Sequence, residues 1–464
     1  MAPPCKLKVL EHCKISPPPA AKLPSTSLPL TFFDIPWLLF PPTQPLFFYH
    51  LPLSTSHFTN SILPHLKHSL SLTLQLFFPL TSTLIITPPH STTPHFVYTA
   101  ADSSISLTIA ESSSDFHHIS GQRQRDAQEF HHLVPRLNLP CSILAVQVTV
   151  FPHCGICIGL SLCQAAADGR TFNNFMKSWA SIFKMGSSRS SLNNLQVPFI
   201  DRKVIKDPNG LESILLKQWL SIGNSQLDKE NHEGANLEEV VRATFVVGRP
   251  DMERLKQLIL TRYRKISGLA GSGSMYLSPY VITCAHIWVC LTKIRYSRSS
   301  NSNIKTNLGK EPHYFGFIAG GITRLGYPVP DTYLGTCVSF GRSEATGDEL
   351  VGENGIVIAA KAIGETIERL NGDVLGGAED WISDWKEMLA SELHVTVTGS
   401  PKVDLYGLDF GWGGPIKIEE IAIDKTHAVS LTESRDVEGG IEVGLVLPKA
   451  EMDAFGSVFR KGLR

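Results

Sequence analysis

One stretch of the chain combines polar side chains with a backbone that could present them to a substrate. Residues 156–162 alternate larger and smaller apolar side chains, which predicts a half-buried strand. A tight turn ending in Asp168-Gly169 follows, and Thr171 is placed to cap the helix after it. Because α/β folds commonly place chemistry where a strand is followed by a helix, the residues of this turn, with Asp168 among them, are the first candidates for a functional site.

The helix after this turn is predicted by its apolar spacing. The residues Phe172, Phe175, Met176, Trp179 and Phe183 recur at three- and four-residue intervals. They form one apolar face, which would hold the helix against a core.

Two other groups of residues could do chemistry, and both have a plainer reading. Cys154 and Cys157 form a lone C-x-x-C without the second ligand pair that a zinc site needs. The histidine pairs at 117–118 and 131–132 have Asp115 and Glu129 nearby, but their spacing matches no known ligand pattern. We therefore predict buried thiols and loop histidines, with no metal site.

Composition narrows the class of protein. The chain has 464 residues, of which 42% are hydrophobic and 18% charged, with a net charge of −1. This length favours two domains, and the charge gives no electrostatic case for nucleic acid or an anionic membrane. The apolar runs at 32–49 and 70–87 are broken by prolines, so neither predicts a membrane span. Nine cysteines without a regular framework suit reduced thiols in a cytoplasmic protein.

Strands and helices are expected to be interspersed along the chain, which predicts an α/β class. We expect a strand hairpin at 142–163, strands at 240–247, 314–322, 393–398, 416–423, 428–431 and 440–447, and helices at 61–78, 251–263, 277–293, 352–370 and 449–460. A polar region at 187–235 reads as a linker. The predicted domains are therefore 1–186 and 236–464.

Asp168-Gly169 on the strand-turn-helix is followed far downstream by Asp-Phe-Gly-Trp-Gly at residues 409–413. Together, and in this order along the chain, the two motifs resemble the plant BAHD family of acyl-CoA-dependent acyltransferases. Asp168-Gly169 matches the end of that family's His-x-x-x-Asp-Gly. The resemblance covers essentially the whole chain. The Tyr-Leu-Gly-Thr-Cys of residues 333–337 is similar to a motif of the malonyltransferases that act on anthocyanin and other phenolic glycosides, and differs from it at two positions.

The resemblance implies a fold of two similar-sized domains of mixed sheets and helices, as in chloramphenicol acetyltransferase, with a cleft between them. It implies acyl-CoA, in particular malonyl-CoA, as a co-substrate, a small glycoside, phenolic or alkaloid acceptor, and no bound cofactor. It also implies a cytoplasmic monomer. Asp409, Gly411 and Trp412 would shape the coenzyme A channel from the second domain, and Ser400 and Lys402 would contact its phosphates. An ordinary solvated loop explains Lys402 equally well.

This sequence departs from the family at the residue that matters most. Gln164 stands where the family has the histidine that acts as general base. An amide does not titrate, and loss of a general base typically costs about 10²–10⁴-fold in rate. Neither His153 nor Cys163 is expected to replace it.

Ile322 also stands where the family has an arginine that pairs with the aspartate, so Asp168 is expected to meet either a replacement partner, with Arg324 and Arg170 as candidates, or solvent. Three readings stay open: a transferase with impaired or altered catalysis, a relative repurposed for elimination, cyclisation or rearrangement, and a non-catalytic homologue.

Overall fold

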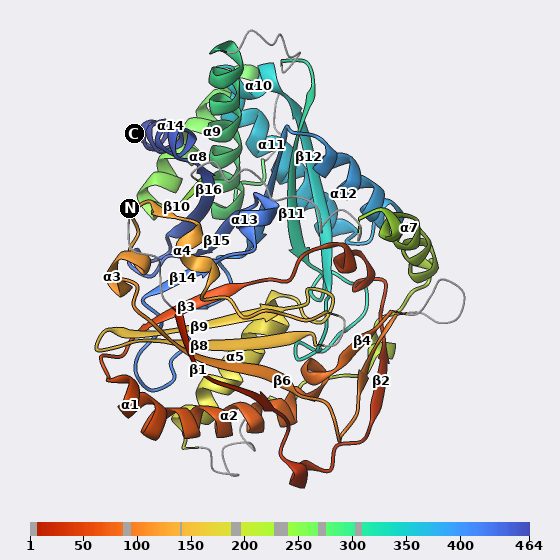
Figure 1. Ribbon diagram of the computed structural model, residues 1–464. Coiled ribbons are helices and arrows are strands. Elements are labelled where there is room, and N and C mark those ends of the chain that lie inside the picture. The colour runs from red at the N-terminus through yellow and green to blue at the C-terminus, as the bar shows by residue number, and fades with distance from the viewer. Residues whose placement is uncertain are drawn as a thin grey trace. The chain divides into compact units, whose positions relative to one another are not determined.

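A computed structural model describes residues 7–86, 94–139, 142–186, 196–226, 240–267, 275–301 and 309–464. Its contacts divide the chain into two compact units (Figure 1). The first unit comprises Met1–Ala235, Pro328–Cys337 and Val403–Lys425. The second comprises Asn236–Tyr327, Val338–Lys402 and Thr426–Arg464. The predicted domains differ from these units, because two later segments return to the first unit and bring the motif at 409–413 with them.

The main sheet of the first unit has the strand order β1-β6-β8-β9-β3-β14. These strands are β1 (Leu7–Ile15), β6 (Ile105–Ser112), β8 (Leu144–Phe151), β9 (Gly155–Leu162), β3 (Pro45–His50) and β14 (Lys417–Glu420). The predicted hairpin of β8 and β9 is confirmed. Every residue of β9 is buried, so the expectation of a half-buried strand is wrong. Small residues alternate with the large ones because both faces are covered: Gly159 lies directly against Leu46 and the carbonyl of Leu133.

Helix α5 (Gly169–Lys184) follows β9 and packs against α2 (Leu63–Leu76) beside this sheet (Figure 1). Its apolar face is as predicted, with Phe175, Met176 and Trp179 buried. A stacked pair of rings, Phe47 of β3 and Phe172 of α5, joins the helix to the sheet at a centroid distance of 6.2 Å. The helix that begins at the candidate site is thereby fixed along its length.

The first unit also contains shorter elements. A small sheet has the order β2-β5-β4, from Thr26–Pro29, His95–Tyr98 and Thr83–Ile85. The short helices are α1 (Thr55–His57), α3 (Phe116–Ile119) and α4 (Gln128–His131), and β7 spans Arg125–Asp126. The predicted linker contains α7 (Leu211–Gln226), which buries Leu211, Leu215 and Trp219 at four-residue spacing. The prediction of a linker missed this helix because its three buried residues are surrounded by polar ones. Residues 187–195 and 227–235 of the linker lie outside the described residues.

The second unit has a mixed sheet in which the order β12-β11-β13-β15-β16-β10 is observed. These strands are β12 (Val338–Thr346), β11 (Pro312–Gly320), β13 (His394–Gly399), β15 (Val429–Glu433), β16 (Ile441–Pro448) and β10 (Val240–Val247). Its helices are α8 (Arg249–Ser267), α9 (Pro279–Asn301), α10 (Gly347–Val351), α11 (Gly355–Gly372), α12 (Trp381–Ala390) and α14 (Lys449–Gly462). The short helix α13 (Ile423–Thr426) belongs to the first unit up to Lys425. The buried helix α9 packs against α11 in its core (Figure 1). Among the helices of the described residues, none is long and apolar enough to cross a membrane.

Candidate active site

The turn between β9 and α5 is closed by the side chain of Asp168. This residue, and not Thr171, is the N-cap of α5: its Oδ1 accepts the backbone N–H of Thr171 at 2.8 Å. An oxygen in this position satisfies one of the unpaired N–H groups of the first turn. Thr171 lies inside that turn, and its hydroxyl donates to the carbonyl of Gly335 at 2.9 Å.

Gln164 is half-buried on the same turn, and both its backbone and its side chain are fixed. Its Nε2 donates to the carbonyl of Pro41 at 3.0 Å. Its own carbonyl accepts the hydroxyl of Thr336 at 2.9 Å. The amide oxygen Oε1 is the group left to meet a ligand, and it can only accept a hydrogen bond. The site can therefore orient a hydroxyl group through Gln164, but this side chain cannot remove its proton.

Asp168 is buried, with 9% of its surface exposed, and its second oxygen is held by two donors. The Cys337 backbone N–H donates to Oδ2 at 3.2 Å, and the Arg170 guanidinium lies 3.5 Å from the same oxygen. Arg170 is thus the cation that accompanies Asp168. Arg324 instead donates to Asn371 and to the carbonyl of Gly320, within the second unit.

Neither of the nearby residues that could have replaced a base is suited to do so. Burial raises the pKa of the Cys163 thiol to about 11, so it stays protonated at neutral pH. His153 lies in the turn at the start of β9, whereas Gln164 follows its end. Eight residues of strand separate them, which corresponds to roughly 26 Å.

The Asp-Phe-Gly-Trp-Gly loop forms a compact structure around Asp409. Its Oδ1 accepts the backbone N–H groups of Gly411 and Gly413 at 2.7 and 2.9 Å, and both glycines have positive φ angles. Its Oδ2 lies 2.5 Å from the Nζ of Lys184, the last residue of α5. The Lys184 hydrogen bond is the main reason why the pKa of Asp409 is lowered. The sequence predicted a tight backbone turn here, and the structure confirms it.

The aromatic residues of this loop attach it to α5. Phe410 is fully buried, with ring centroids 5.2 Å from Trp179 and 5.8 Å from Tyr49. Trp412 stacks on Phe410 at 5.5 Å. The loop therefore supports the helix that begins at Asp168. Ser400 and Lys402 belong to the second unit, where the Ser400 hydroxyl accepts the Lys402 backbone N–H and the Lys402 side chain is exposed.

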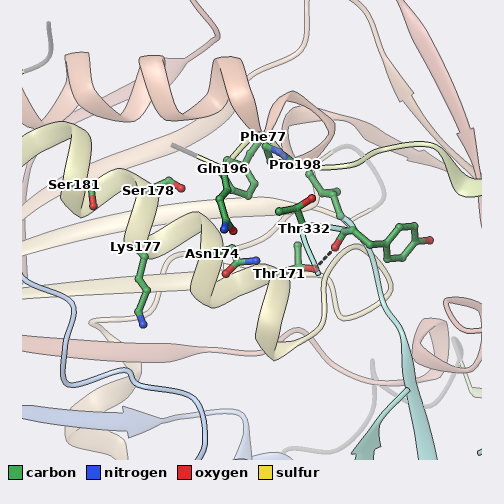
Figure 2. A pocket seen from close by; sticks show the side chains of 11 residues that line it. Phe77, Thr171, Asn174, Lys177, Ser178, Ser181, Gln196, Pro198 and Thr332 are labelled. Atoms are coloured by element: carbon green, nitrogen blue, oxygen red, sulfur yellow. Dashed lines mark hydrogen bonds between the residues drawn. The ribbon is translucent and has the colours of Figure 1, made fainter. Parts of the chain in front are cut away.

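A pocket lies along the polar side of α5 (Figure 2). Asn174, Lys177, Ser178 and Ser181 line it from the helix, and Phe77, Gln196, Pro198 and residues 332–334 complete it. Thr171 also lines it (Figure 2), and its hydroxyl lies 3.3 Å from the carbonyl oxygen of Tyr333. Gln164 is not among the lining residues, so this pocket is separate from the group that would face a reacting hydroxyl.

The other histidine and cysteine candidates have ordinary surroundings. His118 pairs with Glu129 at 2.9 Å and His131 with Asp424 at 2.8 Å. Among the described residues, no three His, Cys, Asp or Glu side chains are grouped so that they could hold a metal ion. All seven cysteines in the described ranges are free thiols. His286, in the second unit, donates a hydrogen bond from its Nε2 to the carbonyl of Phe459 at 3.1 Å, and burial lowers its pKa to about 4.

Several residues that organise the site were not found from the sequence. Thr336 and Cys337 contact Gln164 and Asp168, and the buried pair Asp34 and Arg202 contacts the segment that carries them. These contacts join parts of the chain more than a hundred residues apart. No spacing within the sequence indicates such contacts.

Comparisons with known proteins agree on one family. The model of the Transferase family matches residues 9–461. The malonyl-coenzyme A:anthocyanin 3-O-glucoside-6''-O-malonyltransferase of Dahlia pinnata is 37% identical over 98% of this chain and 97% of that protein. A coumaroyl-CoA:anthocyanidin 3-O-glucoside-6''-O-coumaroyltransferase of Arabidopsis thaliana is 35% identical, with 98% and 97% coverage.

Solved structures share the fold. Vinorine synthase superposes with a TM-score of 0.66 at 16% identity, covering 97% of this chain and 96% of that one. TRI101 of F. sporotrichioides, complexed with coenzyme A and T-2, gives a TM-score of 0.61 at 15% identity over 92% and 96% of the two chains. The predicted α/β class with mixed sheets is thereby confirmed.

Proposed function

Because the chain belongs to the Transferase family of BAHD acyltransferases, we propose that it transfers an acyl group from coenzyme A to a sugar hydroxyl of a phenolic glycoside. Malonyl is the first donor to test, since relatives named as malonyltransferases of anthocyanin and phenolic glucosides match nearly the whole chain. Coumaroyl is the second, since related coumaroyltransferases match to a similar extent.

The observation that carries this proposal is an intact scaffold around an altered residue. Asp168 caps α5 and keeps a cation partner, and the loop at 409–413 is packed against the same helix. Gln164 is held by Pro41 and Thr336 at the point where the helix-capping turn begins. A chain that had lost its function altogether would be under no constraint to keep these interactions together.

In the proposed reaction, the amide oxygen of Gln164 accepts a hydrogen bond from the acceptor hydroxyl. The hydroxyl oxygen forms a bond to the thioester carbon, the carbon–sulfur bond breaks, and the hydroxyl proton ends on the coenzyme A sulfur. Holding both reactants together supplies rate without a base. The absent imidazole lowers that rate by about 10²–10⁴-fold compared with a histidine at the same position.

For coenzyme A we propose contacts from Ser400 and Lys402. The Lys402 ammonium is exposed and the Ser400 hydroxyl shares its turn, which suits a phosphate group. For Asp409, Gly411 and Trp412 we propose an indirect part, because their observed contacts stabilise the loop and α5. The free thiols support a reducing compartment, and we propose a monomer in the cytoplasm that acts on small molecules alone.

A second candidate is chemistry without acyl transfer, such as an elimination, cyclisation or rearrangement. The observation that favours it is the Gln164 side chain itself: its Nε2 is used by Pro41, and it presents no titratable group to a substrate. A non-catalytic binder would share this feature.

Product analysis by mass spectrometry distinguishes these functions. The purified protein, Gln164→His, Gln164→Ala and Gln164→His/Ile322→Arg would each be incubated with malonyl-CoA or coumaroyl-CoA and a panel of phenolic glucosides. We expect a slow acyl transfer by the natural protein, a faster one by Gln164→His and the slowest by Gln164→Ala. Transfer by the histidine variants alone would support the second candidate, and transfer by none of them would contradict the proposal.

A further inference from the structure

We propose that Asp34 and Arg202 form a positioning pair that sets the location of Gln164 and Asp168 through the turn of residues 333–337. In the described part of the chain, the hydrogen bonds of Asp34 and Arg202 reach each other and residues 333 and 336, and not Gln164 or Asp168 themselves. The inference rests on the proposed function only where activity is used as the readout.

The pair is a buried ion pair in the first unit. Asp34 is fully buried and Arg202 is 6% exposed, and the Arg202 Nη1 lies 3.0 Å from the Asp34 Oδ2. The backbone N–H and the hydroxyl of Thr31 donate to the same oxygen, at 2.7 and 2.9 Å. A buried charge is tolerated only when such partners are in good geometry, so the positions of both side chains are tightly specified.

Each member of the pair holds one part of the turn. The Asp34 Oδ1 accepts the backbone N–H of Thr336 at 3.2 Å. The Arg202 Nη1 donates to the Tyr333 hydroxyl at 3.0 Å. Gly335 fits against the guanidinium: it has a φ of +151°, and a Cβ there would lie 2.4 Å from the Arg202 Nη1. The turn is therefore shaped around Arg202.

The turn of residues 333–337 is also hydrogen-bonded to both candidate site residues, Gln164 and Asp168. Thr336 donates its hydroxyl to the carbonyl of Gln164 at 2.9 Å, and Cys337 donates its N–H to Asp168 at 3.2 Å. The carbonyl of Gly335 accepts the N–H of Asp168 at 3.4 Å and the Thr171 hydroxyl at 2.9 Å. A shift of residues 333–337 must consequently move the backbone at both ends of the segment from Gln164 to Asp168.

A displacement of the reacting groups by about 1 Å can cost about 10²-fold in rate, even when its origin is remote. A buried pair is suited to this task because its two charges cannot separate without being left unpaired in the interior. The same pair also restricts the segment of residues 196–205, since Phe199 exchanges backbone hydrogen bonds with residues 332 and 334.

The sharpest test replaces the last link without disturbing the charges. Thr336→Val keeps the side-chain shape but removes the hydroxyl that reaches Gln164, and Thr336→Ser keeps the hydroxyl. We expect kcat to fall by about tenfold for Thr336→Val and to stay within about twofold for Thr336→Ser, with KM for acyl-CoA unchanged in both. Equal rates for the two variants would overturn the proposal.

The pair itself needs a matched control, which the first unit provides. Arg125 is also buried in an ion pair, at 2.7 Å from Glu419, but makes none of the bonds to residues 333–337. Arg202→Met and Arg125→Met therefore remove comparable charges. Tyr333→Phe is the milder companion, since it removes one hydrogen bond and keeps the ion pair.

Alkylation of cysteine gives a readout that does not depend on catalysis. Cys337 is 1% exposed on the turn, and Cys163 is 5% exposed beside Gln164. Treatment of the folded proteins with iodoacetamide, followed by peptide mass spectrometry, measures how often each thiol becomes accessible. We expect Arg202→Met and Tyr333→Phe to accelerate the labelling of Cys337 by about tenfold or more through local opening, and Arg125→Met to leave it near the natural rate.

Two results would overturn the inference. One is an equal acceleration in Arg125→Met and Arg202→Met, which would indicate a general loss of stability. The other is unchanged labelling in both Arg202→Met and Tyr333→Phe. If the natural protein and Gln164→His transfer no acyl group, the proposed function fails, whereas the labelling result still decides whether the pair holds the turn.

Discussion

Asp168 combines three interactions in one buried carboxylate. It caps α5 through Thr171, accepts the N–H of Cys337, and lies beside Arg170. The first two interactions satisfy backbone groups that would otherwise be buried without a partner. Asp168 therefore stabilises the turn between β9 and α5 whether or not the protein catalyses a reaction.

Substitution of Asp168 separates these contributions. We expect Asp168→Ala to lower the free energy of unfolding by about 2–3 kcal/mol, because it removes the cap and leaves the Cys337 N–H unpaired. Asp168→Asn keeps an oxygen for the cap and should cost about 1 kcal/mol. Urea denaturation of the three proteins measures the difference, and equal stabilities for the two variants would show that the cap is not the main contribution.

The sequence predicted the importance of Gln164 and Asp168 but not how each is held. Position in a motif identified both residues, and it identified the lack of an arginine at Ile322. The choice of Arg170 over Arg324 depends on side-chain placement, which a linear pattern does not contain. The assignment of the cap to Thr171 failed because a capping residue is identified by its backbone geometry, and here that geometry is at Asp168.

Helix α5 and the loop at 409–413 stabilise each other. The helix supplies Trp179 and Lys184, and the loop supplies Phe410 and Asp409. The sequence indicated a helix with one apolar face and a tight glycine turn, and both are observed. It did not indicate that they meet, because their aromatic residues are compatible with many other partners.

Truncation of the central aromatic residue tests this contact. Phe410 is fully buried among Trp179, Tyr49 and Phe183, so Phe410→Ala leaves a cavity between loop and helix. We expect it to reduce the free energy of unfolding by about 3–5 kcal/mol. Chemical denaturation measures the change, and a loss below 1 kcal/mol would mean that the loop is not anchored by this ring.

The ion pair between Asp409 and Lys184 leads to a pH-dependent effect. The pKa of Asp409 is lowered in the folded protein, mainly by the Lys184 hydrogen bond, so its contribution is present above its unfolded pKa and lost as pH falls through the folded value. Because Lys184 is largely exposed, Asp409→Asn should cost less than about 1 kcal/mol at pH 7.

Below about pH 4, where an unperturbed aspartate is protonated, the difference between the two proteins should shrink. Denaturant titrations at pH 7, 5 and 3 measure it. A difference that grows toward pH 3 would contradict this assignment of the charge.

The two compact units of the protein are interleaved along the chain. The first unit takes β14 and the turn at 333–337 from beyond residue 235. The predicted boundary at 235 describes only the first passage of the chain from one unit to the other. It does not include the segments 328–337 and 403–425, which belong to the first unit again. Strand pairing such as that of β14 with β3 joins residues about 370 positions apart, as in Lys417 and Phe48, and a local pattern cannot specify it.

This interleaving predicts that residues 1–235 do not fold by themselves. The fragment lacks Glu419 for the buried Arg125 and lacks the strand that pairs with β3. A buried charge without its partner costs about 3–5 kcal/mol, a large part of the stability of an ordinary domain. Urea denaturation followed by circular dichroism should give no cooperative transition for the fragment, beside a cooperative one for the full chain. A sigmoidal transition in the fragment would disprove the prediction.

We propose that this fold performs acyl transfer without a titrating base at position 164. The pH dependence of the transfer rate, measured from pH 5 to 9 for the natural protein and Gln164→His, tests it most directly. For Gln164→His we expect the rate to rise with pH through the imidazole pKa, near 6.5, because the neutral ring is the base. The natural protein should be slower and lack this inflection. An inflection of the same kind in the natural protein would show that another histidine serves as the base and would contradict base-free transfer.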